Sequence, residues 1–294
     1  MNTQHHHTRE QNIGAAVVLN VGFTLIELAG GLWTNSLAIL SDALHDLGDS
    51  ITLVTSWFAE RGARKPPDAR RTFGYQRLSL FAALFSAVVL SAGSLFVLSK
   101  AIPRLIHPEH VNASGMMGLA VVGVLFNAAA FFRLRRGASL NERVLSWHLM
   151  EDVLGWGVIL IGSVIIRIWD NHLIDPLMTV GYTLFIMWGV TRNLRETVNI
   201  LLQGVPAHVD VEGIRRGLLS LDGVEGLHDV HVWSLEGETD VFSGHIVVPE
   251  ELLTNPAQIT TRIKQELERH HIEHSTIELE GPDSCAGPAC DNGM

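Results

Sequence analysis

The stretch SDALHDLGDS, residues 41–50, carries ionisable side chains inside an apolar run that extends over 36–59. These side chains are Asp42, His45, Asp46 and Asp49. A second stretch, WHLMEDVLGW over 147–156, interrupts another apolar run in the same way. A charged side chain near the centre of a bilayer costs about 2.5–3.5 kcal/mol even on the scale obtained from insertion experiments. Ionisable residues within such spans are therefore candidates for function.

The apolar residues are concentrated in roughly the first 190 positions of the chain, which has 294 residues and is 47% hydrophobic. Segments there approach the ~20 apolar residues that cross a hydrocarbon core. They cover 12–33, 36–59, 78–100, 115–133, 144–168 and 174–191. A buried helix of a globular protein is the alternative for any single segment. Six in succession, joined by short polar loops, predict a polytopic α-helical membrane domain with six transmembrane helices.

Basic residues are distributed unevenly between the expected loops. One side holds Arg61, Arg64, Lys65, Arg70, Arg71, Arg77, Arg133, Arg135, Arg136, Arg143, Arg192 and Arg195, and the other holds Lys100, Arg104 and Arg167. Because cytoplasmic loops carry the excess of Lys and Arg, both termini are expected in the cytoplasm. Short loops and a compact chain favour a bacterial inner membrane. The net charge of −10 argues against a nucleic-acid partner.

The last part of the chain has the composition of a soluble domain, which begins near Val205-Pro206. Its pattern predicts helix over 210–221, strands at HDVHVWSL (228–235) and VFSGHIVVP (241–249), helix over 256–270 and a strand at HSTIELE (274–280). This order, α-β-β-α-β, indicates a cytoplasmic α+β ferredoxin-like domain. The expected organisation is an N-terminal tail over 1–11, a transmembrane transport domain over 12–204, a metal-binding dimerisation domain over 205–284 and a cysteine-containing tail over 285–294.

Two His-x-x-x-Asp pairs occur in the interrupted spans. His45 and Asp49 are four residues apart, as are His148 and Asp152, so each pair shares one face of its helix. Together they offer two nitrogen and two oxygen ligands, which suits tetrahedral zinc. A structural hydrogen bond between helices is the alternative for either pair. Glu151 lies about 100° round the helix from Asp152 and is not expected to be a ligand.

Asp42 and Asp46 point to other parts of their helix. Asp42 either lines an access path for the ion or hydrates a cavity, and the sequence does not choose between these roles.

A midplane zinc ion can be structural, catalytic or transported. A catalytic zinc usually keeps one position open for water, and no H-E-x-x-H motif occurs in the apolar region. His and Asp both accept protons, and metal affinity falls when they do, so the site suits exchange of metal for protons. A membrane zinc sensor that binds metal without moving it is the competing hypothesis. An enzyme that uses the zinc is a third, and an exchangeable water as fourth ligand would identify it.

The motifs SLAILSDALHDLGDS, WHLMEDVLGW, FGYQR, VPAHVD, GVEGLHDVHVWSL and HSTIELE occur in this order over nearly the entire chain. In this order they resemble the zinc-exporting branch of the cation diffusion facilitator family. The resemblance implies a homodimer that exports zinc, with cadmium and cobalt as further candidates, in exchange for protons. It implies that the transported metal binds His45, Asp49, His148 and Asp152, and that a His at position 45 favours zinc.

The resemblance also bears on sites outside the membrane. Relatives hold metal in the loop after the second helix with an aspartate and two histidines; here Asp68 is kept but Arg71 and Tyr75 replace the histidines, so this site is expected to be absent. The cytoplasmic domain is expected to bind zinc through residues that match ligands in relatives. These are His228, His245, His274 and Glu280, with Cys285, Cys290 and the run His5, His6, His7 as further candidates.

Other interpretations of these tails remain open. The cysteines form a metal-binding or redox pair or lie in a dispensable tail. The histidine run is equally well a flexible scavenging tail or a cloning remnant.

Overall fold

The computed structural model describes residues 20–63, 65–134 and 140–282, with the side chains of 53, 56, 60 and 133–148 left out. The described chain divides into two compact units. One comprises the residues up to 58 together with 82–193, and the other comprises 59–81 together with 194–282. The first unit is helical, and the second contains the only sheet among the described residues.

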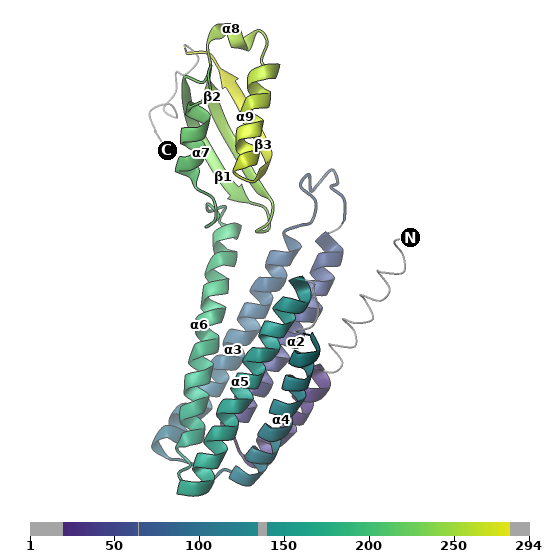
Figure 1. Cartoon of the computed structure of the whole chain (residues 1–294), viewed down its shortest axis with the longest axis vertical. Coiled ribbons are helices and arrows are strands. Elements are labelled where there is room, and N and C mark those ends of the chain that lie inside the picture. Colours follow the sequence, from purple (N-terminus) through teal and green to yellow (C-terminus); the bar gives the residue numbers. More distant parts are fainter. Residues whose placement is uncertain (1–19, 64, 135–139, 283–294) are drawn as a thin grey trace. The chain divides into compact units, whose positions relative to one another are not determined.

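The long helices agree closely with the apolar segments of the sequence (Figure 1). Residues 20–34 are helical, followed by α2 (Leu37–Ala63), α3 (Leu78–Ile106), α4 (Ala113–Leu134), α5 (Leu140–Trp169) and α6 (Ile174–Leu201). Among the described residues, three helices are long and apolar enough to cross a membrane: Leu78–Ile106, Ala113–Phe132 and Leu149–Trp169. Large apolar side chains such as Phe85, Leu125 and Ile161 face outward, as lipid-facing residues do. Six crossings remain a prediction from the sequence.

The start of α2 is fixed by a carboxylate from α6. The Asp175 side chain is fully buried; its Oδ1 accepts a hydrogen bond from Ser36 Oγ at 2.6 Å and its Oδ2 accepts one from the Leu37 backbone N–H at 2.9 Å. The Ala38 N–H also points to Oδ1, at 3.3 Å. The first backbone N–H groups of a helix lack partners within the helix and carry partial positive charge. Asp175 therefore caps α2 and ties its N-terminal end to α6.

Close packing positions α5 beside α4 and the helix over 20–34. A Cβ atom on Gly123 would lie 2.3 Å from the indole of Trp156, so only glycine permits this approach. The Phe23 ring stacks on Phe126 with centroids 4.9 Å apart and meets the edge of Trp156 at 6.1 Å. Aromatic pairs in these geometries add stability beyond the apolar area that they bury. This cluster holds the three helices in a fixed rotational setting.

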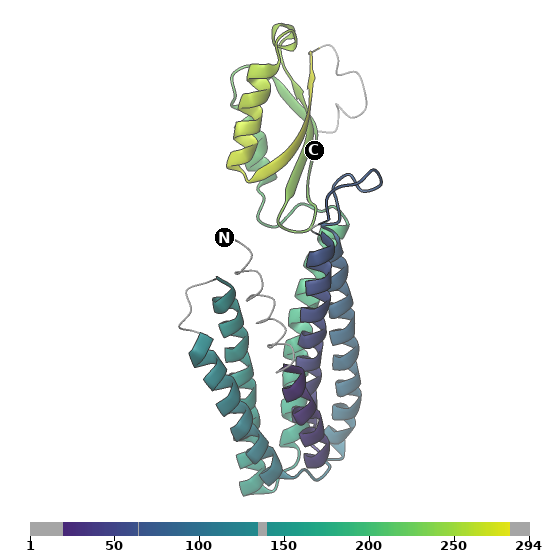
Figure 2. The same cartoon turned by 90° about the vertical axis from the view of Figure 1, so that its right-hand side faces the viewer.

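The second unit folds as a three-stranded sheet with helices on one face (Figure 2). Its elements are α7 (Val211–Leu219), β1 (Gly226–Ser234), β2 (Asp240–Val247), α8 (Glu250–Leu253), α9 (Ala257–Arg269) and β3 (Ile272–Glu280). β1 pairs antiparallel and β3 parallel to the central β2. The α-β-β-α-β order predicted from the sequence is confirmed, and the short α8 after Pro249 is an addition.

Alternation along the strands separates the two faces of this sheet. Phe242 and Ile246 on β2 are fully buried against Ile214 of α7 and Ile263 of α9. Side chains of a strand alternate between faces, so His245 projects from the opposite face, away from the helices. The sheet thus leaves one side free to carry polar side chains.

The segment between α2 and α3 is held by Asp68. Its Oδ1 accepts backbone hydrogen bonds from Arg70 and Arg71, both at 2.8 Å, and its Oδ2 accepts one from the Tyr75 hydroxyl at 2.7 Å. The Arg71 guanidinium lies over the Tyr75 ring, 4.7 Å from its centroid. The Tyr75 hydrogen bond and the two backbone N–H groups lower the pKa of Asp68. The residues that replace the expected histidines thus hold this carboxylate in a turn.

We expect Asp175→Ala to destabilise the protein by about 1–3 kcal/mol, because three donors at the buried start of α2 lose their acceptor. Thermal unfolding of the purified protein in detergent should show a midpoint lower by several degrees. Asp170→Asn is the control: it removes an exposed carboxylate in the loop just before α6, keeps a residue that tolerates the left-handed backbone there (φ 51°), and should change the midpoint little. Equal midpoints for the two variants would contradict the capping role.

We expect Tyr75→Phe to raise the pKa of Asp68, because the ionised carboxylate loses its strongest hydrogen-bond donor. A lowered native pKa stabilises the loop at pH values above the unfolded pKa, and this stabilisation disappears as pH falls through the native pKa. Amide hydrogen exchange over 65–77, corrected for intrinsic rates, should show protection lost at a higher pH in the variant. The same transition in Asp68→Asn would rule out Asp68 as its cause.

Candidate metal sites

His45 and Asp49 of α2 lie together on one side of the helix, as their spacing predicts. Nε2 of His45 is 3.7 Å from Oδ2 of Asp49, and both side chains are half-buried. The edge of the His45 ring meets the Tyr182 ring of α6, with centroids 6.1 Å apart. One imidazole nitrogen and one carboxylate oxygen are thus presented side by side in a partly enclosed environment.

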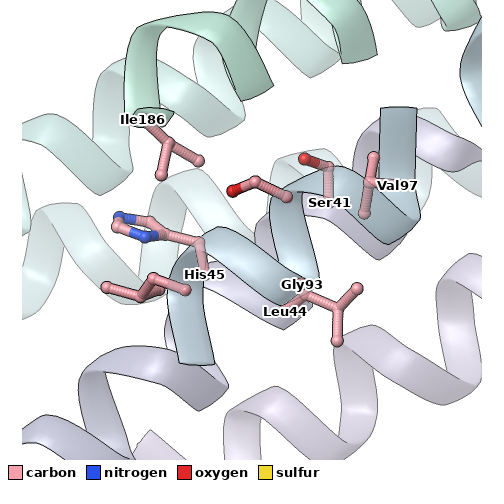
Figure 3. A pocket seen from close by; sticks show the side chains of 8 residues that line it. Ser41, Leu44, His45, Gly93, Val97 and Ile186 are labelled. Carbon is pink, nitrogen blue, oxygen red and sulfur yellow. The ribbon is translucent and has the colours of Figure 1, made fainter. Parts of the chain in front are cut away.

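Both side chains line an open cavity of about 800 Å³ bordered by α2, α3, α5 and α6. Its polar lining includes Asp42, Glu151 and Tyr182, and the rest is largely apolar. On its other side, His45 borders a small cavity of about 10 Å³ lined by residues of α2, α3 and α6, room for about one water (Figure 3). A hydrated ion therefore has room to reach His45 and Asp49 from the large cavity.

Asp42 is buried one turn before His45 and faces this cavity. The Tyr182 hydroxyl donates a hydrogen bond to its carboxylate. A buried carboxylate needs a donor or a cation, and Tyr182 supplies the donor from α6. Its place on the cavity wall is in accord with both roles that the sequence left open, lining an access path for the ion and hydrating the cavity.

The second pair lies on α5, which borders the same cavity at Glu151 and Gly155. Asp152 is half-buried, and its charge acts on Asp42, so it faces α2. The side chain of His148 lies outside the described residues. The meeting of all four predicted ligands on one ion therefore remains a prediction. Glu151, which the sequence excluded as a ligand because of its angle to Asp152, is exposed and lines the cavity wall.

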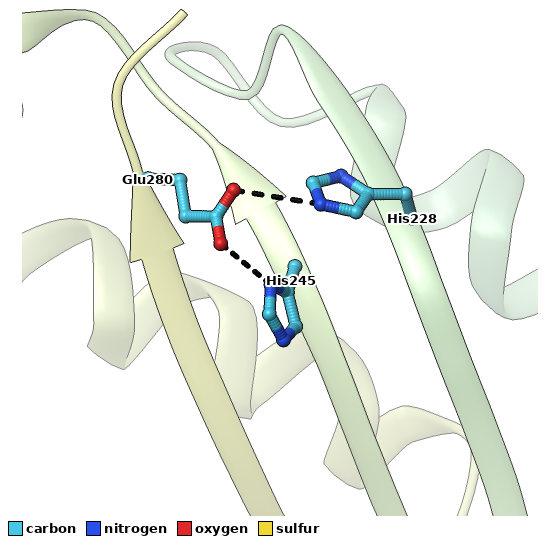
Figure 4. Close-up of side chains that lie close together, drawn as sticks. All are labelled: His228, His245 and Glu280. Carbon is cyan, nitrogen blue, oxygen red and sulfur yellow. Dashed lines mark hydrogen bonds and ion pairs between the residues drawn. The ribbon is translucent and has the colours of Figure 1, made fainter. Parts of the chain in front are cut away.

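A second cluster lies on the open face of the sheet. His228 of β1 and His245 of β2 are directly paired in the antiparallel register, and Glu280 ends β3 beside them. Nδ1 of His245 is 2.6 Å from Glu280 Oε1, and Nε2 of His228 is 3.4 Å from Glu280 Oε2 (Figure 4). One ligand atom from each residue lies within 4.8 Å of the others.

This cluster fits a zinc ion. Tetrahedral zinc with bonds of about 2.1 Å separates its ligand atoms by roughly 3.4 Å, close to the separations present here. Two imidazoles and a carboxylate are a common zinc donor set. Three ligands leave one coordination position for a further residue or water.

Other residues that the sequence proposed for this site fall in different places. His274 of β3 lies opposite Val241, and its ring contacts Phe73 with centroids 5.4 Å apart. The structure therefore brings Glu280, and not His274, to His228 and His245. Five candidate residues lie outside the described part of the chain: Cys285, Cys290, His5, His6 and His7.

The sequence did not single out Asp229 and Tyr182. Asp229 adopts a left-handed backbone with φ of 51° at a β-bulge, and its carboxylate contacts both His231 and His245. A non-glycine residue with positive φ is uncommon and marks a local requirement. The run HDVH suggests an alternating strand and conceals this bulge.

A helical membrane domain with a His–Asp cavity, joined to an α+β domain with a histidine–carboxylate cluster, is the arrangement of a membrane metal transporter. Family models match almost the whole chain: the cation efflux transmembrane domain over residues 13–202 and the cation efflux protein cytoplasmic domain over 206–281. The chain therefore belongs to the cation efflux family, the cation diffusion facilitators. It is a metal-cation transporter and not an enzyme.

Similar proteins cover nearly the same length. The cadmium, cobalt and zinc/H⁺–K⁺ antiporter of Bacillus subtilis is 30% identical over 94% of this chain and 91% of its own. The metal cation efflux system protein CzcD of Cupriavidus metallidurans is 32% identical over 92% and 86%, and the zinc transporter ZitB of Escherichia coli 34% identical over 92% and 87%. A solved metal-bound C-terminal domain of CzcD matches at 30% identity, covering 24% of this chain and 99% of that one with a TM-score of 0.23.

Proposed function

We propose that this chain exports zinc from the cytoplasm in exchange for protons, by alternating access to a site on α2 and α5. The transported ion is held by His45, Asp49, His148 and Asp152. The observation that carries the proposal is the His45–Asp49 pair on the wall of a large cavity that α5 also lines. The relatives named above as transporters of zinc, cadmium and cobalt support zinc as the main substrate and the other two as further candidates.

The chemistry of the ligands supports coupling to protons. Zinc binds only the deprotonated forms of histidine and aspartate, so protons and metal compete for the same atoms. Protonation from the outer side would then release the ion, and deprotonation on the cytoplasmic side would restore affinity. The antiporter named among the relatives agrees with such exchange.

The membrane setting follows from the sequence and the family. An excess of Arg and Lys in the loops on one side supports six crossings with both termini in the cytoplasm of a bacterial cell. The C-terminal domain matches the cytoplasmic domain of cation efflux proteins, a family of domains named for dimerisation, which supports a homodimer.

We expect His45→Ala and Asp152→Ala each to abolish zinc flux in proteoliposomes, because an incomplete ligand set binds zinc too weakly to transport it. Flux of radioactive zinc driven by a pH gradient is the measurement. His107→Ala, which alters an exposed histidine after α3, is the control and should transport normally.

Two results would reject the assignment. Normal flux in either ligand variant would show that the ion binds elsewhere. Zinc binding by the wild type without accumulation in everted vesicles, with or without a pH gradient, would instead indicate a membrane zinc sensor.

We further propose that the cytoplasmic domain binds zinc at His228, His245 and Glu280. The fit of these ligand atoms to a tetrahedral ion supports this proposal. Cys285, Cys290 or a residue of His5–His7 is a candidate for the fourth position. The zinc would bridge the ends of all three strands and so stabilise the sheet.

Zinc content tests this second site. In a His45→Ala background, which removes the transported ion, we expect His245→Ala to lower the bound zinc by about one ion per protomer. His274→Ala should keep the full zinc content, because its ring lies against Phe73 and away from the cluster. Metal analysis of the purified variants shows whether His245 or His274 binds the ion. Loss of zinc in His274→Ala alone would place the site elsewhere on β3.

A further inference from the structure

The helix over 20–34 carries a buried carboxyl group that the metal sites do not use. Glu27 is 1% exposed, and it belongs to the few large side chains that are fully buried. Neither of its carboxylate oxygens has a hydrogen-bond partner among the described residues. A buried and unpaired carboxylate is among the most unfavourable groups that a protein can contain. Its presence calls for a proton or a cation at this position.

Acidic side chains of two other helices face Glu27. Asp46 and Asp42 approach it from α2, and the charge of Asp152 reaches it from α5. Asp42 is 4% exposed and Asp46 is 7% exposed, so solvent does little to screen them. Mutual repulsion of these charges makes a fully ionised cluster more unfavourable than Glu27 alone.

The remaining neighbouring helix supplies no compensating charge. α4 packs against the same helix, where Leu119 contacts Gly30 and Phe126 stacks on Phe23. The α4 sequence from Ala113 to Phe132 contains no ionisable residue. The largest charge effects on the Glu27 carboxyl all come from acidic residues: Asp46, Asp42 and Asp152.

A single proton resolves this arrangement. Two ionised carboxylates are both acceptors and cannot bond to each other, whereas a carboxylic acid donates a hydrogen bond to a neighbouring carboxylate. A proton on Glu27 removes one buried charge and creates a hydrogen bond to Asp46. A metal ion would need several ligand atoms within about 4.8 Å of one another, and among the described residues only His228, His245 and Glu280 meet that condition. The geometry therefore favours a proton.

We propose that Glu27 is a proton-binding site of the transport cycle, separate from the four metal ligands. The inference rests on the proposed zinc–proton exchange and identifies one of its proton carriers. When zinc occupies the site on α2 and α5, its positive charge lowers the cost of an ionised Glu27. The O–H bond of Glu27 then breaks and its proton is released to water; when zinc departs, a proton from the outer side binds again.

The proton count on zinc binding tests the proposal. Calorimetric titration of the purified full-length protein with zinc, in buffers of different ionisation enthalpy, gives the protons released per ion. We expect Glu27→Gln to release about one proton fewer than the wild type, because glutamine mimics the protonated acid and cannot lose a proton. Glu27→Asp should restore release, and Glu196→Gln, at an exposed position of α6, should match the wild type.

An infrared measurement on the wild type makes the test independent of how the variants fold. A band from a protonated carboxyl group that shifts on ¹³C labelling of glutamate, and that disappears on addition of zinc, would support the proposal. Absence of such a band, or a proton count for Glu27→Gln equal to that of the wild type, would overturn it. These results can be told apart from failure of the proposed zinc–proton exchange, because in that case the wild type itself would show no zinc transport driven by a pH gradient.

Discussion

The helical unit is organised around the need to compensate buried negative charge. Glu27, Asp42, Asp46 and Asp175 are each less than a tenth exposed, and each needs a donor, a proton or a cation. Asp175 receives its donors from the start of α2, and Asp42 receives one from Tyr182. Both of these carboxylates have partners within the protein, whereas the proposed transport site at His45 and Asp49 would be compensated by the transported ion. The proposed metal site therefore lies beside carboxylates that have partners within the protein.

Fixed contacts around the cavity give this chemistry a defined geometry. The Asp175 cap sets the start of α2, two turns before His45, and the contact of Trp156 with Gly123 sets α5 against α4. Because α2 and α5 carry the predicted ligands, small rotations of either helix would alter the separation of His45 and Asp152. The proposed alternating access would require such changes, and the Asp175 cap and the Trp156–Gly123 contact would restrain them at these points.

The helices and the shared face of His45 and Asp49 could be predicted from the sequence, because the patterns that indicate them lie within one segment of the chain. Apolar run lengths predicted the helices, and the i,i+4 spacing predicted that His45 and Asp49 share a face. Partners from different helices could not be predicted, since the pattern along a helix does not fix its rotation against its neighbours. Tyr182 on Asp42 is one case, and Glu27 facing Asp46 is another. On the sheet, the choice of Glu280 over His274 depends on the register of β3 against β2, which a single strand pattern does not contain.

The bulge at Asp229 has a consequence for how the sheet tolerates change in length. Leu227 and Val232 are five residues apart, and yet both face the helices. His228 and His231 are three residues apart, and both face the other way. Only the extra residue reconciles these two requirements, because strand side chains otherwise alternate strictly. Deletion of one residue here would hardly change the composition, but on one side of the deletion every strand side chain would point to the opposite face of the sheet. Either the histidine would then enter the apolar interior, or an aliphatic residue would leave it.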